Sequence, residues 1–101
     1  MSNTIHSVEE ITALLHPVFS EYNINKAILF GSYSKNTATE KSDVDLCVDS
    51  GLRGLKFVGL IESLKNALGG KEVDVLDVTH IEKGSRVERE VEKTGVQIYE
   101  K

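Results

Sequence analysis

The feature that most constrains the fold is the stretch 43–49, in which polar and apolar residues alternate strictly. This alternation is typical of a β-strand that packs one face against a core and turns the other face away from it. The aliphatic residues fall on one face, and the other face carries Asp43, Asp45, Cys47 and Asp49. Because aspartate is uncommon in strands, two aspartates at neighbouring positions on one face make these carboxylates candidates for a functional site.

The segments on either side of this strand predict an order in which helices and strands alternate. Ser7 and Glu10 match a capping box at the start of the first helix, within which Pro17 predicts a kink or a division. From the apolar spacing we expect helices over 8–22 and 55–68, strands over 26–30, 43–49 and 73–78, a turn or helix that ends at Gly95, and a short edge strand over 96–99. This order predicts an α/β (α+β) fold, a small mixed sheet flanked by helices, as a single domain over residues 1–101.

Charge and hydropathy exclude several classes of protein. Twelve Lys and Arg against sixteen Asp and Glu give a formal net charge of −4, so the chain lacks the basic stripe that tight nucleic-acid binding requires. No apolar run approaches the ~20 residues that span a bilayer, and residues 1–4 lack the features of a signal peptide. Cys47 is a lone cysteine, without a partner for a disulfide or a zinc site. We therefore expect a cytoplasmic protein that does not associate with membranes.

Asp43 and Asp45 form a candidate metal site. Because they are two residues apart in a strand, their Cβ atoms lie roughly 7 Å apart and both carboxylates can converge on one small cation. A site of oxygen ligands alone suits Mg²⁺, which takes further ligands from substrate phosphates. Asp74 in the third strand reaches the same face if the two strands pair, and Asp77 replaces it if the register differs. The alternative is a half-exposed sheet whose outward residues happen to be acidic.

Gly31 and Ser32 follow the apolar stretch 26–30 directly, at a strand end of the kind that binds ligands in α/β sheets. Glycine lets a phosphate approach the backbone closely. The Ser32 hydroxyl and the amides of the following turn can donate hydrogen bonds to that phosphate. On its own, such a pair more often marks an ordinary turn.

The combination is more specific than its parts. An apolar strand ends in Gly31-Ser32, ten residues follow, and then comes Asp43-Val44-Asp45, with Asp74 inside a further strand. In these motifs, which extend over nearly the whole chain, the sequence resembles the minimal nucleotidyltransferases of the polymerase-β-like superfamily. The resemblance implies the nucleotidyltransferase fold and an enzyme that uses one or two Mg²⁺ ions. Such an enzyme moves a nucleoside monophosphate from a nucleoside triphosphate, here ATP, to a hydroxyl.

The resemblance also implies a role for each motif residue. Asp43 and Asp45 would hold the divalent metal, and Asp74 would complete the metal site or act as general base. Gly31 and Ser32 would hold the triphosphate. These roles agree with the physics of nucleotidyl transfer, which demands positioning and charge neutralisation more than covalent help.

One part of the motif departs from the family pattern. Members often carry an Arg-Gly pair four and five residues after the glycine, where this chain has Lys35 and Asn36. Lys35 keeps the positive charge for the triphosphate but lacks the bidentate fork of arginine. Asn36 tolerates a left-handed backbone better than most residues, so the turn is expected to survive.

Small stand-alone members of this family resemble the antitoxin half of toxin–antitoxin pairs, which implies a protein partner. The acceptor would be a tyrosine of a cognate HEPN-type toxin that AMP addition silences, and the two proteins would form a hetero-oligomer. One alternative is a binding module that neutralises its partner by covering it, without catalysis. Transfer to an antibiotic or to RNA is a further alternative, against which the low positive charge and the missing acceptor-binding sequence count.

The remaining polar residues are expected to have no part in catalysis. His6, His16 and His80 lack the spacing of metal ligands. Cys47 has no evident basic neighbour that would activate it as a nucleophile. The charged run 82–93 is typical of a solvated helix face.

Overall fold

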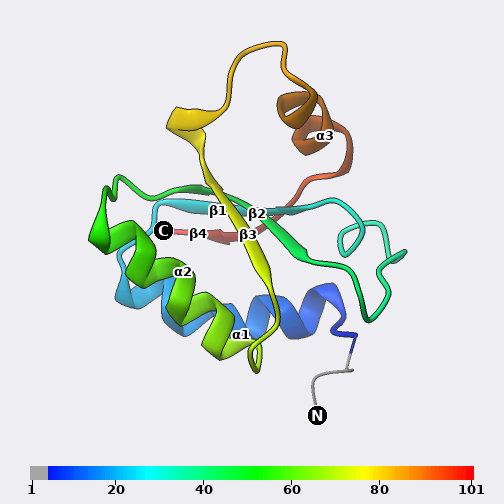
Figure 1. Cartoon of the computed structure of the whole chain (residues 1–101), viewed down its shortest axis with the longest axis horizontal. Helices are drawn as coiled ribbons and strands as arrows, with labels where there is room; N and C mark the ends of the chain where they lie inside the picture. Colours follow the sequence, from blue (N-terminus) through cyan, green and yellow to red (C-terminus); the bar gives the residue numbers. More distant parts are fainter. Residues whose placement is uncertain (1–4) are drawn as a thin grey trace.

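The computed structural model describes residues 5–101, so the stretch 1–4, which counted above against a signal peptide, lies outside the described residues. The helices predicted over 8–22 and 55–68 and the four predicted strands are present, with bounds correct to within one residue, and the segment before Gly95 ends in a helix. In chain order the elements are α1 (Val8–Glu21), β1 (Lys26–Phe30), β2 (Val44–Asp49), α2 (Leu55–Ala67), β3 (Val73–Asp77), the 3₁₀ turn η1 (Val78–His80), α3 (Arg86–Thr94) and β4 (Val96–Glu100) (Figure 1). Among these described helices, none is long and apolar enough to cross a bilayer.

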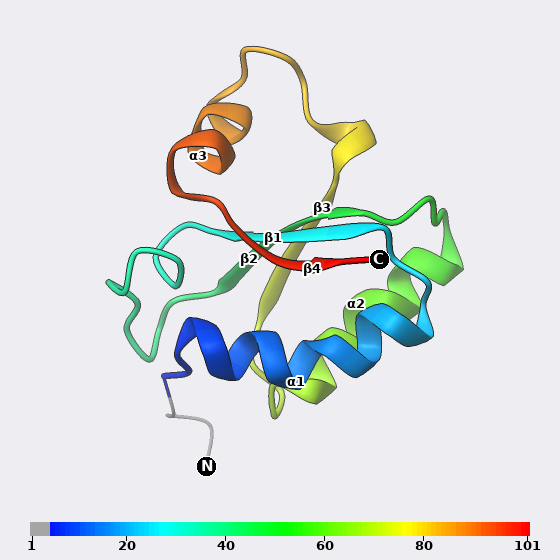
Figure 2. The same ribbon diagram turned by 180° about the vertical axis from the view of Figure 1, so that it is seen from behind.

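The strands form a mixed sheet in the order β3-β2-β1-β4. Strand β1 pairs antiparallel with β2 and with β4, whereas β2 pairs parallel with β3 through the crossover helix α2. Helices α1 and α2 lie against one face of the sheet, and α3 lies on the opposite side (Figure 1 and Figure 2). The predicted mixed sheet flanked by helices, with an edge strand at its end, is therefore confirmed.

Helix α1 begins as the sequence predicts. The Glu10 N–H donates a hydrogen bond to Ser7 Oγ (3.1 Å) and the Ser7 N–H donates one to Glu10 Oε1 (2.9 Å), which completes the capping box. The helix runs on through Pro17, so the predicted division at that residue is wrong. Proline has no N–H, so Pro17 leaves the carbonyl of Ala13 without its helical hydrogen bond. Both residues are exposed, and water can satisfy that carbonyl.

The core lies between the two helices and the sheet. Leu55 and Val58 belong to the apolar spacing that predicted the helix over 55–68, which implies that they face the core, but they are 88% and 53% exposed. Each residue of an α-helix is turned by about 100° from the one before it, so residues spaced at i, i+3 do not stay on one face over several turns. Leu55 and Val58 therefore lie on the side of α2 opposite Leu60. The fully buried side chains of this layer include Ile11, Leu15 and Phe19 of α1, Leu60 and Leu64 of α2, and Val44, Leu46 and Val48 of β2.

Candidate active site

The three predicted carboxylates lie at the amino-terminal ends of the parallel strands β2 and β3. Asp45 and Asp74 are register partners, so their side chains share one face of the sheet. Asp43 precedes β2 by one residue and, two positions from Asp45, falls on the same face. The pairing of the two strands that would bring Asp74 to this face is therefore confirmed.

Negative charge accumulates around Asp45. Partial burial, followed by the charges of Asp74, Asp43 and Glu90, raises the pKa of Asp45 from 3.8 to about 6. Within residues 5–101, no three His, Cys, Asp or Glu side chains converge closely enough to form a finished metal site. The cluster thus offers oxygen donors that repel one another until a cation or a proton neutralises them, and hard oxygen donors of this kind fit a Mg²⁺ ion.

Gly31 lies directly against this cluster, at the end of β1. Its neighbour Phe30 is the register partner of Asp45, and the φ angle of Gly31 is +80°. A Cβ atom on Gly31 would lie 2.5 Å from Asp45 Oδ2. Glycine is therefore required here twice, for the left-handed backbone and for the space that the Asp45 carboxylate fills.

The loop after Gly31 folds into turns that leave its first amides free. The N–H groups of Lys35 and Thr37 donate to the carbonyls of Gly31 (3.3 Å) and Ser32 (3.0 Å), and Ser34 Oγ donates to the Gly31 carbonyl (2.8 Å). Within the described chain, the N–H groups of residues 32–34 donate no hydrogen bond. These consecutive donors are suited to phosphate oxygens.

Lys35 and Asn36, which stand where the resembling family often has Arg-Gly, differ in how they fit the loop. Asn36 has a φ angle of +60°, the left-handed conformation that asparagine was expected to tolerate here. Lys35 Nζ lies 3.8 Å from Glu90 Oε1, and both side chains are close to half exposed. The Lys35 ammonium is therefore paired with a carboxylate from helix α3.

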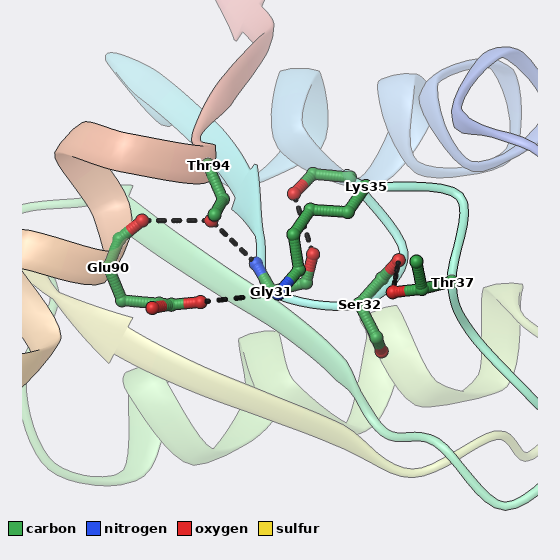
Figure 3. Close-up of polar contacts among 7 residues, drawn as sticks. Gly31, Ser32, Lys35, Thr37, Glu90 and Thr94 are labelled. Carbon is green, nitrogen blue, oxygen red and sulfur yellow. Dashed lines mark hydrogen bonds and ion pairs between the residues drawn. The ribbon is translucent and has the colours of Figure 1, made fainter.

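Helix α3 also contributes Thr94, which sequence analysis missed together with Glu90. Thr94 Oγ1 accepts a hydrogen bond from the Gly31 N–H (3.0 Å) and donates one to the Glu90 carbonyl (2.8 Å) (Figure 3). The expectation that the run 82–93 is only a solvated face is thus wrong for Glu90, whose carboxylate faces the site. The i, i+4 spacing of Glu90 and Thr94 indicates that they share one face of a helix. Nothing in the sequence indicates that this helix contacts the loop after Gly31.

Asp77, the alternative third carboxylate, has a structural role at the other end of β3. Burial alone would raise the pKa of Asp77, but hydrogen bonds from the side chains and backbone amides of Ser50 and Thr79 outweigh it and lower the pKa to about 2. The side chain is 3% exposed. Because its oxygens are already engaged by these donors, Asp77 is excluded as the third member of the acidic cluster.

The Cys47 thiol and a cavity at the other end of the parallel strands lie outside the acidic cluster. Burial raises the pKa of the Cys47 thiol, which leaves it protonated and unreactive near neutral pH. His80 and Arg53 line a cavity of about 560 Å³ at the carboxyl ends of β2 and β3. The parallel strands therefore carry two polar regions at opposite ends, and only the amino-terminal one adjoins the Gly31 loop.

Comparison with known proteins identifies the family and the fold. The sequence profile of the family described as polymerase beta nucleotidyltransferases matches residues 14–101. A protein of Methanocaldococcus jannaschii, provisionally named a protein adenylyltransferase, is 36% identical over 77 residues, which cover 74% of this chain and 82% of the relative. A chain of a toxin–antitoxin crystal structure with AMP-PNP superposes with a TM-score of 0.73 and 25% identity, covering 89% of this chain and 73% of that one. A complex of a tri-AMPylated Shewanella oneidensis HEPN toxin with an MNT antitoxin matches in fold, with a TM-score of 0.68 and 22% identity over 93% of this chain and 73% of that one.

Proposed function

The chain belongs to the polymerase-β nucleotidyltransferase family, and on this premise we propose that it transfers AMP from ATP to a tyrosine hydroxyl of a cognate HEPN-type toxin. It would act as the antitoxin of that pair. The provisional name of the Methanocaldococcus jannaschii relative supports a protein acceptor. The likeness to a chain of a toxin–antitoxin structure that holds AMP-PNP supports both the nucleotide and the partner.

One observation carries the proposal: the register of three strands gathers the motif residues at one place. Asp45 faces Asp74 across β2 and β3, and it faces Phe30, the residue before Gly31, across β1 and β2. Carboxylates for a divalent ion and a loop with free amides for phosphate therefore adjoin each other. Adjacent sites of these two kinds are what transfer from a nucleoside triphosphate requires.

Asp43, Asp45 and Asp74 would hold Mg²⁺. Their negative charge suits a divalent cation. Burial and then the acidic neighbours raise the pKa of Asp45, and a bound cation would remove the repulsion between the carboxylates. Bound divalent ions neutralise charge on the triphosphate and on the attacking oxygen. In this proposal each carboxylate serves as an oxygen ligand on one shared face of the sheet.

The chain's own residues would then position the reactants. Ser32 and the free amides of residues 32–34 bind phosphate oxygens, and Lys35 adds a positive charge. The acceptor oxygen bonds to the α-phosphorus while the bond from that phosphorus to the bridging oxygen breaks, and pyrophosphate leaves. Asp74 accepts the proton of the acceptor hydroxyl. Its place beside Asp45, on an exposed part of the strand, leaves it accessible to an incoming protein.

Transfer of label tests the proposal directly. The chain is incubated with Mg²⁺, ATP labelled in the α-phosphate and the HEPN-type protein encoded beside it. We expect label on a tyrosine of that protein, and a loss of roughly 100-fold or more in the rate with Asp43→Asn, which removes a metal-binding carboxylate. Asp49→Asn is the matched control, since it makes the same change on the same strand but at the far end from the cluster.

Two results would contradict the proposal. Label transfer that Asp43→Asn leaves unchanged would remove the cluster from the reaction. Full neutralisation of the toxin by Asp43→Asn, with no label on the toxin from either form, would instead identify the non-catalytic binding module.

A further inference from the structure

Helix α3 contacts the candidate nucleotide loop although it is poorly anchored in the core. None of its residues Arg86–Thr94 is buried. Even so, Glu90 and Thr94, one helical turn apart and therefore on one face, direct their polar atoms toward the loop (Figure 3). A helix with little apolar packing that makes these two polar contacts is placed to act on the loop.

The hydrogen bond to Thr94 fixes Gly31 from one side. Strand β1 ends at Phe30, and the Gly31 N–H finds its acceptor in Thr94 Oγ1 at 3.0 Å. The hydroxyl is itself oriented, because it donates to the Glu90 carbonyl at 2.8 Å. On the other side of Gly31, the carboxylate of Asp45 fills the space that a Cβ would need. Gly31 is therefore held between Thr94 and a carboxylate of the acidic cluster.

The end of α3 is pressed against β1, which sets the position of Thr94. A Cβ on Gly95 would collide with the Val91 carbonyl oxygen and would lie 2.8 Å from Ile28 Cγ2. Only glycine allows this approach without displacing the helix end or the strand. The contact is independent of the Thr94 hydrogen bond and holds the helix terminus at the same place.

The ion pair between Glu90 and Lys35 is weaker than the hydrogen bond to Thr94, so another anion can replace Glu90 beside Lys35. The Glu90 carboxylate lies 3.8 Å from Lys35 Nζ, and both side chains are close to half exposed, so solvent screens their attraction. A triphosphate carries more negative charge than one carboxylate and would compete for Lys35 effectively. Glu90 also adds its charge to the acidic cluster that this triphosphate must approach.

We propose that α3 positions the nucleotide-binding loop: Thr94 fixes Gly31 so that the free amides keep their place beside Asp45, and Glu90 holds Lys35 until the triphosphate takes its place. The inference rests on the function proposed above. It assigns two positioning residues that touch no substrate, and it gives their substitutions opposite effects on nucleotide affinity.

Calorimetry with α,β-methylene ATP, in which the bond that the transfer breaks is replaced by a stable bridge, measures both effects. With Mg²⁺ present, Thr94→Val should weaken binding roughly tenfold, since the Gly31 N–H loses its acceptor. Thr94→Ser keeps the hydroxyl and should bind within about twofold of the wild type. Hydrogen exchange at the Gly31 amide, read by NMR, should be faster only in Thr94→Val.

Without metal, Glu90→Gln should tighten binding about two- to threefold, because it frees Lys35 and removes a like charge. Glu92→Gln makes the same charge change at an exposed position of α3 and should leave binding unchanged. A merely structural role for Glu90 would instead weaken binding when it is lost.

The outcomes separate the inference from the proposed function. Wild-type affinity in Thr94→Val, or equally weak binding in Thr94→Ser, would overturn the role of Thr94. Weaker or unchanged metal-free binding in Glu90→Gln would overturn the exchange at Lys35. A wild type that binds no nucleotide at all would contradict the proposed function, and the inference would fall with it.

Discussion

Gly31 is the residue on which most of the site depends, because three constraints meet at its backbone. Its φ angle of +80° is a conformation that disfavours every residue with a Cβ. The missing Cβ leaves room for Asp45 Oδ2, and its N–H is bound by Thr94. A change at this position would therefore disturb the acidic cluster and the loop together.

We expect Gly31→Ala to lower the rate of AMP transfer roughly 100-fold, because the Asp45 carboxylate must move away from its place. The left-handed backbone also costs about 1–2 kcal/mol of stability. Gly51→Ala is the matched control: its φ angle is +68°, but nothing lies within 4 Å of the added Cβ. Urea unfolding and the label-transfer rate measure the two effects. Equal activity in the two variants would contradict the role given to Gly31.

At the scale of elements, Asp77 joins the carboxyl ends of β2 and β3 to the turn η1. It accepts hydrogen bonds from Ser50, just after β2, and from Thr79 in η1. These bonds hold the pKa of Asp77 at about 2, against 3.8 ordinarily, despite the opposing effect of burial. A group whose pKa is lowered on folding stabilises the protein above its unfolded pKa, and this stabilisation is lost as the pH falls toward the folded pKa.

We therefore expect Asp77→Asn to lower the free energy of unfolding by about 2 kcal/mol at pH 7. The difference from the wild type should shrink as the pH falls from 4 to 2, where the wild-type carboxylate gains its proton. Urea unfolding at a series of pH values measures this difference, with Asp49→Asn as the control for loss of a strand-end charge. A difference that is the same at pH 7 and at pH 2 would show that ionisation of Asp77 contributes nothing.

Much of the element order could be predicted from sequence because the strongest signals are local. The alternation in 43–49 and the capping box at Ser7 depend on neighbouring residues alone, and both are confirmed. The outward placement of Leu55 depends on which turn of α2 meets the sheet, which spacing does not fix. The contacts of Glu90 and Thr94 depend on how α3 returns to β1, and a charged helix with only Val87 and Val91 as apolar residues does not reveal which element it packs against.

At the scale of the whole molecule, the mixed sheet is what gathers the site. The antiparallel pairing of β1 with β2 places Gly31, at the end of one strand, beside Asp45, at the start of the next. The parallel pairing of β2 with β3 then places Asp74 alongside. Motif residues 31 to 74 could be predicted together because their order and spacing resemble those of the minimal nucleotidyltransferases. The registers themselves, which decide between Asp74 and Asp77, required the structure.

The central claim is that the acidic cluster and the Gly31 loop together bind a metal–nucleotide complex. Thermal melting with and without Mg²⁺ and ATP tests it most directly, comparing the wild type with the double variant Asp43→Asn, Asp45→Asn. At ligand concentrations about 100 times the dissociation constant, binding adds about 2.7 kcal/mol, which for a domain of this size raises the melting temperature by roughly 10 °C or more. We expect this rise in the wild type and in Asp49→Asn, and none in the double variant relative to its own ligand-free melting temperature. An equal rise in the double variant would contradict the claim.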